Sequence, residues 1–248
     1  MNQIKTVIFG SRDVSKLCLK LLIDKFEEFK VVGYVLHQNS PNPSDEKWIV
    51  DFCKNAKIPI VSHAELLDFD FNFALSLAYD KRIEEELISI PNLGIINIHL
   101  APLPSFGGHN SLYHAIRECF STGKCKYGFT THYIDKNLDQ GGIIYISDVN
   151  ISNEDTAFSL YHKTLLTLPK LFEETLRTVL RSYPNKIQDI SDGSIGSRYF
   201  KKNQIELEVD LTQTPEAIIN HILALSFPSK QPGYAIIASK KIFLSYDD

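Results

Sequence analysis

Residues 94–100 read GIINIHL, a stretch in which Asn97 and His99 are the only polar residues. A strand with one face in water alternates apolar and polar residues, whereas this stretch is almost continuously apolar. Nearly continuous apolar strands are typical of parallel sheets that helices cover on both faces. The stretch therefore predicts a buried strand of such a sheet.

Three similar runs lie earlier in the chain. They read IKTVIFG (4–10), VVGYVL (31–36) and FNFALSLAY (71–79). The spacing of apolar residues between the runs predicts helices from Leu17, over 46–57 and from Arg82, with a short strand over 58–61. Strands that alternate with helices predict an α/β, Rossmann-like fold in which helices cover both faces of a mostly parallel sheet.

The chain beyond residue 100 adds a helix over 110–120 and two β-rich runs, 127–134 and 143–149, that predict a hairpin. A long helical pattern follows over 155–182. Pro169 should kink or divide this helix, because its ring removes a backbone donor.

The sequence changes character after residue 182. IQDISDGSIGSRYFKK has the composition of a loop, PEAIINHILAL predicts a helix near Pro215, and YAIIASKKIFL predicts a strand, a turn and a second strand. We therefore expect one large domain over 1–182 and a small C-terminal α+β subdomain over 183–248.

The composition excludes several classes of protein. With 44% hydrophobic and 23% charged residues the chain is typical of a globular protein. A net charge of −4 leaves no excess of Lys and Arg to neutralise the phosphates of DNA or tRNA. No apolar run approaches the ~20 residues of a bilayer span, and MNQIKTVIFG lacks the features of a signal peptide. We expect a cytoplasmic protein that binds neither bulk nucleic acid nor a membrane.

The four cysteines are scattered. Cys18, Cys53, Cys119 and Cys125 form no CxxC pair and none lies near a histidine at metal-ligand spacing. We expect buried free thiols, since a free cysteine packs as a small apolar side chain.

The most informative residues lie at the end of the strand 94–100. Asn97 and His99 are two apart, so both side chains point to the same side of the sheet. Ligands of open parallel sheets bind outside the carboxyl ends of the strands, where this pair should lie. The alternative is a hydrogen-bonded Asn and His that merely close the strand.

Two further features follow the pair. LAPLPSFGG (100–108) combines prolines that restrict the backbone with glycines that let it turn tightly, as a loop at an active site requires. Asp139 lies in IDKNLDQGG, the expected turn of the hairpin, where it is either functional or an ordinary Asx-turn residue.

Taken together, NIHLAPLPSFGG from Asn97 and LDQGG from Leu138 resemble the folate-dependent formyltransferase family, with its Asn-x-His strand, Pro-rich loop and Leu-Asp-x-Gly turn. The resemblance covers roughly the first 180 residues in order and spacing, so 1–182 would be the formyltransferase catalytic domain. SRYFKKNQIELEVDL and the segment that ends in ALSFP resemble, more weakly, the C-terminal part of methionyl-tRNA and sugar formyltransferases.

The resemblance implies a catalytic trio. Asn97 and His99 would donate hydrogen bonds to the oxyanion of a tetrahedral intermediate, a contribution that can reach ~3 kcal/mol per donor. His99 would also take a proton from the amine, because an imidazole accepts protons near neutral pH. Asp139 would orient His99 and favour its charged form. No step calls for a metal.

The co-substrate implied by the resemblance is 10-formyltetrahydrofolate. Its pterin would lie in a slot between two backbone segments, and much of the recognition would come from main-chain groups. The residues that map onto these segments are Ser76, Leu77, Ala78, Tyr79, Ile134, Asp135 and Leu138. Leu77 and Tyr79 could equally be core and rim residues.

Family members formylate glycinamide ribonucleotide, methionyl-tRNA or the amine of a nucleotide-linked sugar. This chain has FGSRDV where the first group has a Gly-Ser-Asn loop, and SFGGH where the second has an Arg-rich loop. Its length and its GSRDV start resemble the sugar enzymes. The expected acceptor is dTDP-4-amino-4,6-dideoxyhexose for O-antigen or surface polysaccharide synthesis, with a 3-amino sugar nearly as plausible.

Six residues are candidates for acceptor contacts: Arg12, Asp13, His109, Asn110, Tyr199 and Lys202. The first two could instead be a solvated pair at a strand end, and Asn110 could simply cap the following helix. Tyr199 and Lys202 could bind a base or a phosphate.

Two expectations concern partners and class. IIASKKIFL could pair across a two-fold axis and form a homodimer. A hypothesis from another class is an inactive module that binds folate or a nucleotide sugar, although such a module has no need of the trio.

Overall fold

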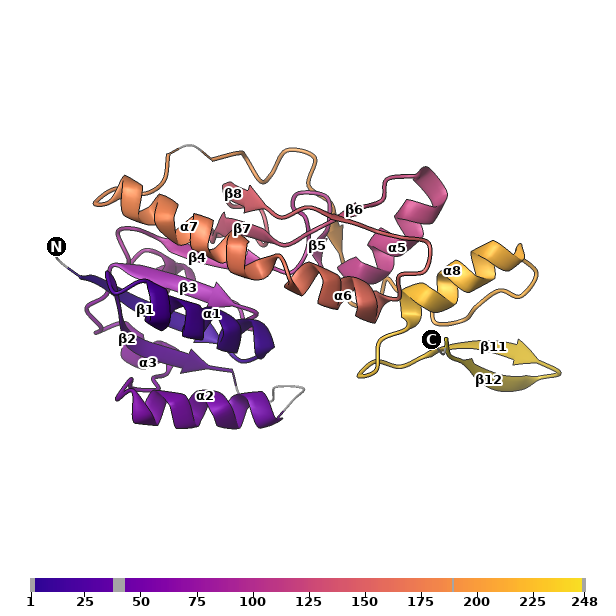
Figure 1. Ribbon diagram of the computed structural model, residues 1–248, viewed down its shortest axis with the longest axis horizontal. Coiled ribbons are helices and arrows are strands. Elements are labelled where there is room, and N and C mark those ends of the chain that lie inside the picture. The colour runs from indigo at the N-terminus through magenta and orange to yellow at the C-terminus, as the bar shows by residue number, and fades with distance from the viewer. Residues whose placement is uncertain (1–2, 38–42, 189, 247–248) are drawn as a thin grey trace.

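The computed structural model describes residues 3–37, 43–188 and 190–246. Its central sheet has six strands in the order β2-β1-β3-β4-β7-β8 (Figure 1). The strands are β2 (Phe29–Leu36), β1 (Ile4–Gly10), β3 (Phe73–Leu77), β4 (Ile95–His99), β7 (Thr130–Tyr133) and β8 (Ile143–Ile146). The first four are parallel, whereas β7 is antiparallel to β4 and β8 to β7. The predicted mostly parallel sheet is confirmed.

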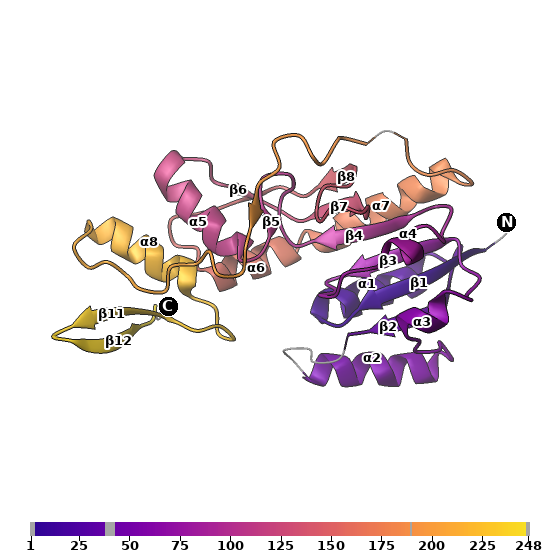
Figure 2. The same ribbon diagram turned by 180° about the vertical axis from the view of Figure 1, so that it is seen from behind.

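Helices cover both faces of this sheet, as Figures 1 and 2 show from opposite sides. One face carries α1 (Asp13–Lys25), α2 (Pro43–Asn55) and α7 (Leu168–Ser182), which contribute to the larger hydrophobic core. The other face carries the single-turn helices α3 (His63–Leu66) and α4 (Glu85–Ile88), which contribute to a smaller core. All five side chains of β3 are buried, which explains why its sequence shows no alternation.

Three elements in this half differ from the prediction. α2 begins at Pro43, three residues early, because proline is preorganised for the first turn of a helix. The strand over 58–61 is reduced to one bridge between Ile60 and Tyr34. The helix from Arg82 shrinks to α4, since Glu84 is still extended and Pro91 prevents continuation beyond Ser89.

The long helical pattern over 155–182 is divided, as Pro169 predicts. α6 (Ala157–Leu165) ends before α7, and Pro169 lies in the first turn of α7, where its missing N–H costs nothing. The two runs of the hairpin are also divided. The first becomes β6 (Lys126–Tyr127) and β7, and the second becomes β8 and β9 (Val149–Asn150). At the first break, a Cβ on Gly128 would lie 1.7 Å from the Ser147 carbonyl oxygen, so only glycine fits.

The C-terminal part contains the expected helix and hairpin, which confirms the small α+β addition to the fold. They are α8 (Pro215–Leu225), β11 (Gly233–Ile237) and β12 (Lys240–Leu244), and α8 packs on α5 (Ser111–Thr122). The prediction of a loop over 187–202 missed one strand: β10 (Tyr199–Phe200) pairs in parallel with β5 (Gly107–Gly108). Across the described residues, no helix is long and apolar enough to cross a membrane.

The prediction of four free thiols was wrong for one pair. Cys119 and Cys125 form a disulfide, whereas Cys18 and Cys53 are free and buried as expected. Cys119 lies near the end of α5, and Gly123, with φ at +73°, ends the helix and turns the chain back. This turn brings Cys125 to within 4.5 Å of Cys119, measured between Cα atoms.

Candidate active site

Strand β4 presents Asn97 and His99 on one side of the sheet. Both are half-buried. Ile96, which precedes the pair, and Ile98, which lies between its two members, are buried in the larger core. Register then decides their neighbours: on the antiparallel strand β7, His132 lies directly opposite Asn97. The polar pair therefore meets a third polar residue across the strands.

His132 holds the amide of Asn97. The Nδ1 atom of His132 donates to the Tyr133 carbonyl at 2.8 Å, which leaves Nε2 to accept from Nδ2 of Asn97 at 3.0 Å. Burial, followed by the charge that His99 carries when it is protonated, lowers the pKa of His132 to about 4. His132 is therefore neutral at pH 7 and remains a hydrogen-bond acceptor for Asn97.

This shift predicts an acid-sensitive fold. The unfolded His132 takes up a proton near pH ~6.5, whereas the folded one does so only near its lowered pKa, about 4. Stability should fall as the pH drops through this window, by up to ~3 kcal/mol from this group. Thermal unfolding of the intact protein and of His132→Gln between pH 7 and 4.5 measures this loss of stability. The control is His162→Gln, because His162 is exposed.

We expect a flatter curve for His132→Gln alone, with a residual slope because burial also lowers the pKa values of His114 and His221. Parallel curves for the intact protein and His132→Gln would contradict the prediction.

His99 has a partner at each ring nitrogen. Its Nε2 atom donates to the Phe106 carbonyl at 3.0 Å, so Nδ1 carries the lone pair of the neutral ring. Nδ1 lies 3.5 Å from Oδ1 of Asp139. A proton that arrives at Nδ1 therefore creates an imidazolium next to a carboxylate.

Asp139 is held by its backbone conformation and by a hydrogen bond to one of its oxygens. Its backbone is left-handed, with φ at +55°, in the turn between β7 and β8, and Oδ2 accepts a hydrogen bond from the Gly108 amide at 2.8 Å. The side chains of Asp139 and His99 are only 19% and 13% exposed. The structure thus brings Asn97, His99 and Asp139 together. Asp139 contacts Gly108 and His99, which lie outside its own turn, so it is not only an Asx-turn residue.

The Pro-rich loop contributes main-chain groups to the same cluster. Its Phe106 carbonyl contacts His99 and its Gly108 amide contacts Asp139. Gly108 has φ at +84°, and a Cβ there would lie 2.3 Å from the Phe200 carbonyl oxygen of β10. Glycine is required at this position by both conformation and space.

The residues predicted to contact the pterin lie in two adjoining segments. Ser76 and Leu77 are buried in β3, where they pair with β1 on one side and with β4 on the other, so their side chains are not exposed to a ligand. Arg82 Nη2 donates to the Lys136 carbonyl at 3.2 Å and joins the segment after β3 to the hairpin turn. Within that turn, Asp135 accepts from the Asn137 amide, and Leu138 is 54% exposed.

The other members of the two segments point elsewhere or only border the site. Ala78 has φ at +52°, and Ile134 donates its amide to the Ile95 carbonyl at 2.8 Å. The Tyr79 hydroxyl bonds to His63 at 2.9 Å, and its ring packs on Phe9. The Tyr79 side chain is therefore engaged by the protein.

Arg12 and Asp13 are not a solvated pair. Arg12 forms an ion pair with Asp80, while its Nε atom is buried without a partner among the described residues. Asp13 accepts from the Tyr161 hydroxyl at 2.8 and 2.9 Å. Both side chains are thus held at the carboxyl end of β1.

His109 and Asn110 follow the glycines of the loop. His109 is exposed, and its amide donates to the Phe200 carbonyl at 2.9 Å. Asn110 occupies the N-cap position of α5, but its left-handed backbone, with φ at +56°, prevents a side-chain cap. Its Nδ2 atom instead donates to the Lys202 carbonyl at 3.1 Å, so the capping alternative was wrong.

Tyr199 and Lys202 lie on and beside β10. The Tyr199 ring lies against Gly108, whose amide donates to Asp139, and burial, followed by the negative charge of Asp139, raises the pKa of its hydroxyl. Lys202 is exposed. The sequence could not reveal this juxtaposition, because the pairing of β10 with β5 joins segments that are far apart in the chain.

Two groups of the cluster escaped the sequence reasoning. The Phe106 carbonyl is a main-chain group, which every residue has, so the residue type at this position does not reveal its role. His132 belongs to a run of residues, TTHY, that reads as an ordinary strand, and only the register with β4 gives it a partner. A polar residue within a buried strand was the available hint.

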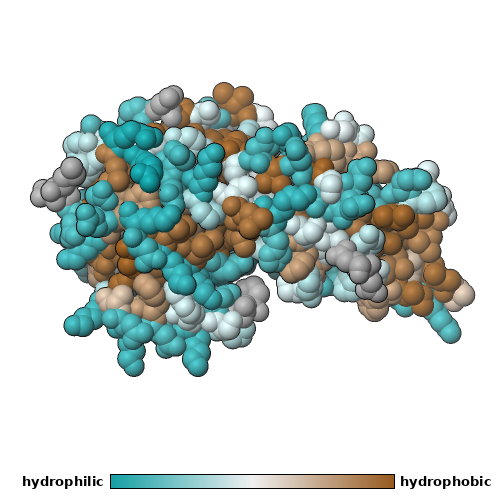
Figure 3. All heavy atoms as spheres, in the orientation of Figure 1, coloured by the Kyte–Doolittle hydropathy of each residue, from teal (hydrophilic) through white to brown (hydrophobic). Residues whose placement is uncertain are grey.

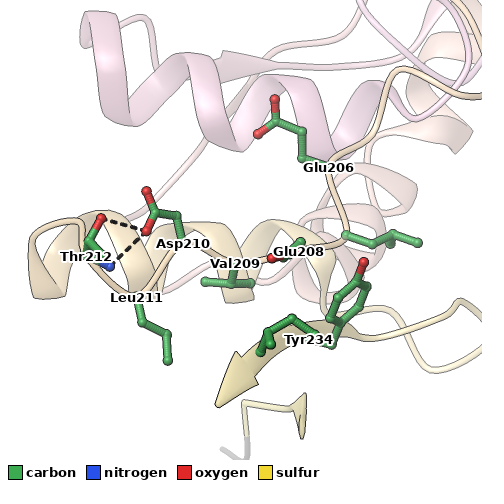
Figure 4. Close-up of a pocket in the computed structure, with 9 residues that line it drawn as sticks. Glu206, Glu208, Val209, Asp210, Leu211, Thr212 and Tyr234 are labelled. Carbon is green, nitrogen blue, oxygen red and sulfur yellow. Dashed lines mark hydrogen bonds between the residues drawn. The ribbon is translucent and has the colours of Figure 1, made fainter. Parts of the chain in front are cut away.

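A separate pocket of ≈580 Å³ lies in the C-terminal part, lined by residues 206–212 with Tyr234 and Ile236 (Figure 4). None of its lining residues belongs to the predicted site. Within residues 3–37, 43–188 and 190–246, no group of three or more His, Cys, Asp or Glu side chains could hold a metal ion.

Comparisons with known proteins identify the family of the chain. The family model described as formyl transferase matches residues 40–176, more than half of the chain. A methionyl-tRNA formyltransferase of Clostridioides difficile is 26% identical over 225 residues, which cover 82% of this chain and 71% of the relative.

Solved structures share the whole fold. A 4-N formyltransferase from Francisella tularensis superposes with a TM-score of 0.80 at 18% identity, covering 100% of this chain and 98% of that one. The sugar 3N-formyl transferase WlaRD, solved in the presence of dTDP and 5-N-formyl-THF, superposes with a TM-score of 0.78 at 25% identity, over 98% and 85%. On the strength of the family match, the chain belongs to the formyl transferase family and is a formyl-transferring enzyme.

Proposed function

We propose that this enzyme transfers the formyl group of 10-formyltetrahydrofolate to the primary amine of a nucleotide-linked amino sugar. The acceptor we favour is a dTDP-4-amino-4,6-dideoxyhexose, made in the cytoplasm for O-antigen or another surface polysaccharide. The observation that carries the proposal is the contact of His99 and Asp139 with each other and with the loop 104–108, next to Asn97, which His132 holds on β4. An inactive binding module would have no use for such a cluster.

The first step is attack of the neutral amine nitrogen on the formyl carbon, which turns the formyl oxygen into an oxyanion. Asn97 has two Nδ2 hydrogens, and His132 takes only one of them, so the second is free to donate to the oxyanion. Because neutral His132 fixes the amide, this donor is oriented before the reaction begins. Preorganised donors of this kind are worth ~3 kcal/mol each.

The second step moves a proton. Because Nε2 of the neutral His99 ring donates to the Phe106 carbonyl, Nδ1 is the nitrogen that would accept the proton that the amine releases. Asp139, 3.5 Å away, would stabilise the imidazolium by its charge. The folate nitrogen then leaves as the C–N bond to the carrier breaks, and the proton on His99 is available to it.

The folate side of the proposal rests on the two segments that Arg82 joins, 76–79 and 134–139. As the resemblance implies, main-chain groups of these segments would recognise the pterin, because the side chains of Ser76 and Leu77 are buried. The presence of 5-N-formyl-THF in the WlaRD structure supports a formylated folate here.

The acceptor side rests on the residues beside Asp139. Tyr199 is 44% exposed, and its ring lies against Gly108, whose amide donates to Asp139, so an acceptor stacked on this ring would lie near the trio. Lys202 and His109 are exposed, and Arg12 follows β1 at the carboxyl edge of the sheet. The presence of dTDP with WlaRD supports a nucleotide sugar.

A second candidate acceptor is methionyl-tRNA, which the relative from Clostridioides difficile favours. Two observations oppose it. The net charge is −4, and the loop 104–110 contains no Lys or Arg that could contact a phosphate.

The acceptor assay decides between these candidates. We expect formylation of a dTDP-linked 4-amino or 3-amino sugar, followed by absorbance of the released folate, and no efficient formylation of methionyl-tRNA. Activity on tRNA that falls steeply with salt, as phosphate binding requires, would contradict the sugar proposal. Tight folate binding without turnover of any amine would instead favour the inactive module.

We also propose that the two parts of the chain have different roles and that the protein forms a homodimer. Residues 1–182 would bind folate and perform chemistry, while 183–248 would complete the acceptor site and supply a dimer contact. Figure 3 shows apolar atoms over the C-terminal elements, and Ile236, Ile237, Ile242 and Phe243 of the hairpin are 43–57% exposed. Two copies of such a hairpin could pair and bury these side chains.

A further inference from the structure

One short strand from the C-terminal part holds the loop that supplies main-chain groups to His99 and Asp139. The Gly107 amide donates to the Arg198 carbonyl at 3.0 Å, and the Arg198 amide donates to the Pro104 carbonyl at 3.0 Å. With the bond from His109 to Phe200, the pairing comprises few hydrogen bonds. A pair of two-residue strands is marginal by itself, so side chains must add to its stability.

The side chain of Arg198 makes this addition. Its Nε atom donates to the Ser105 carbonyl at 3.0 Å, and Nη1 contacts Oε2 of Glu118 on α5 at 2.7 Å. Its guanidinium carbon lies 4.9 Å from the ring centre of Phe106 and 5.6 Å from that of Phe200. One planar group thus touches the loop, the strand and the helix that follows the loop.

An aromatic layer extends the same contact. Phe106 of the loop and Phe200 of β10 lie face to face, with ring centres 6.0 Å apart and planes at 20°. Phe200 also stacks on His114 of α5, with ring centres 3.9 Å apart and planes at 17°. Burial, and then the charge of Arg198, lower the pKa of His114, which keeps that ring neutral.

We propose that Arg198 is a positioning residue for formyl transfer: it fixes residues 104–108 so that the Phe106 carbonyl stays on His99 and the Gly108 amide on Asp139. The inference rests on the proposed roles of those two residues. Arg198 acts through the loop and not on the formyl group. Its side chain is 44% exposed, so the ion pair with Glu118 contributes little to stability, and geometry is what it supplies.

The test compares Arg198→Leu, Arg198→Lys and a matched control, Arg177→Leu. Arg177 also lies over a phenylalanine, at 5.6 Å from the Phe26 ring, and pairs with an acid, Glu173, but on α7 and outside the proposed site. Because a displacement of about 1 Å can cost ~100-fold in rate, we expect Arg198→Leu to lower kcat by about 10- to 100-fold. The KM for formylfolate should change less than about threefold. Arg198→Lys keeps the charge but loses the planar fork, and should lie in between.

Amide hydrogen exchange supplies a readout that needs no acceptor. We expect exchange at Gly107, Gly108 and His109 to accelerate at least about tenfold in Arg198→Leu, while exchange in β3 and β4 stays unchanged, since a tenfold change corresponds to only ~1.4 kcal/mol of local opening. Arg177→Leu should change neither kcat nor loop exchange. If no amino sugar is turned over, the proposed acceptor fails, but the exchange data still decide whether Arg198 holds the loop.

Three results would overturn the inference. The first is unchanged loop exchange in Arg198→Leu. The second is a kcat within about threefold of the intact protein despite faster exchange, which would make the loop contact structural only. The third is a raised KM for the acceptor at constant kcat, which would make Arg198 a binding residue.

Discussion

Replacement of His99 by Asn, or of Asp139 by Asn, is expected to lower turnover at least ~100-fold while folded stability and nucleotide binding change little. His99→Asn removes Nδ1, the proposed proton acceptor, and the bond to the Phe106 carbonyl. Asp139→Asn keeps the size of the side chain and an oxygen for the Gly108 amide, but removes the charge beside Nδ1. Both changes should lower kcat with only a modest change in KM.

Steady-state kinetics with the preferred amino sugar, together with thermal unfolding, measure this result. His162→Asn is the control, because His162 is exposed on α6 and outside the proposed site. If His99→Asn retained more than about a tenth of the turnover, the assignment of His99 as proton acceptor would be withdrawn.

A chain shortened to residues 1–183 should keep its sheet and its formylfolate binding but lose turnover about 100-fold or more. The trio and both proposed pterin segments precede residue 140, so the folate half of the site would remain. The shortening removes β10, and with it the carbonyl partners of the Gly107 and His109 amides. It also removes Tyr199, the proposed acceptor contact next to Asp139.

A chain of residues 1–230 is the matched control. It lacks only the hairpin of β11 and β12, so it should keep most of its turnover and sediment as a monomer if the hairpin forms the dimer. Wild-type kcat/KM in the 1–183 chain would show that the C-terminal part is structural.

Gly108→Ala in the intact chain tests the same contact without shortening. Its Cβ would lie 2.3 Å from the Phe200 carbonyl oxygen and would require an unfavourable φ of +84°, so the loop should detach from β10. We expect a loss of turnover comparable to that of the 1–183 chain, with the sheet intact.

Local patterns in the sequence predicted much of the fold because they depend on neighbours in the chain. The apolar runs of β1 to β4 reflect burial on both faces, and the division between α6 and α7 follows from the ring of Pro169. The shared direction of Asn97 and His99 follows from the two-residue period of a strand. Short elements, such as the helix from Arg82, were misjudged because one turn carries too little periodicity.

The sequence by itself thus determined the parallel sheet, the helices on its faces and the strand that carries Asn97 and His99. Only the tertiary structure decided that His132 lies opposite Asn97, that β10 holds the loop, and that Cys119 is bonded to Cys125. Each of these depends on strand register or on a backbone turn, and neither is encoded in the type of residue at one position. Burial, which lowers the pKa of His132, likewise exists only once the sheet and its helices have packed.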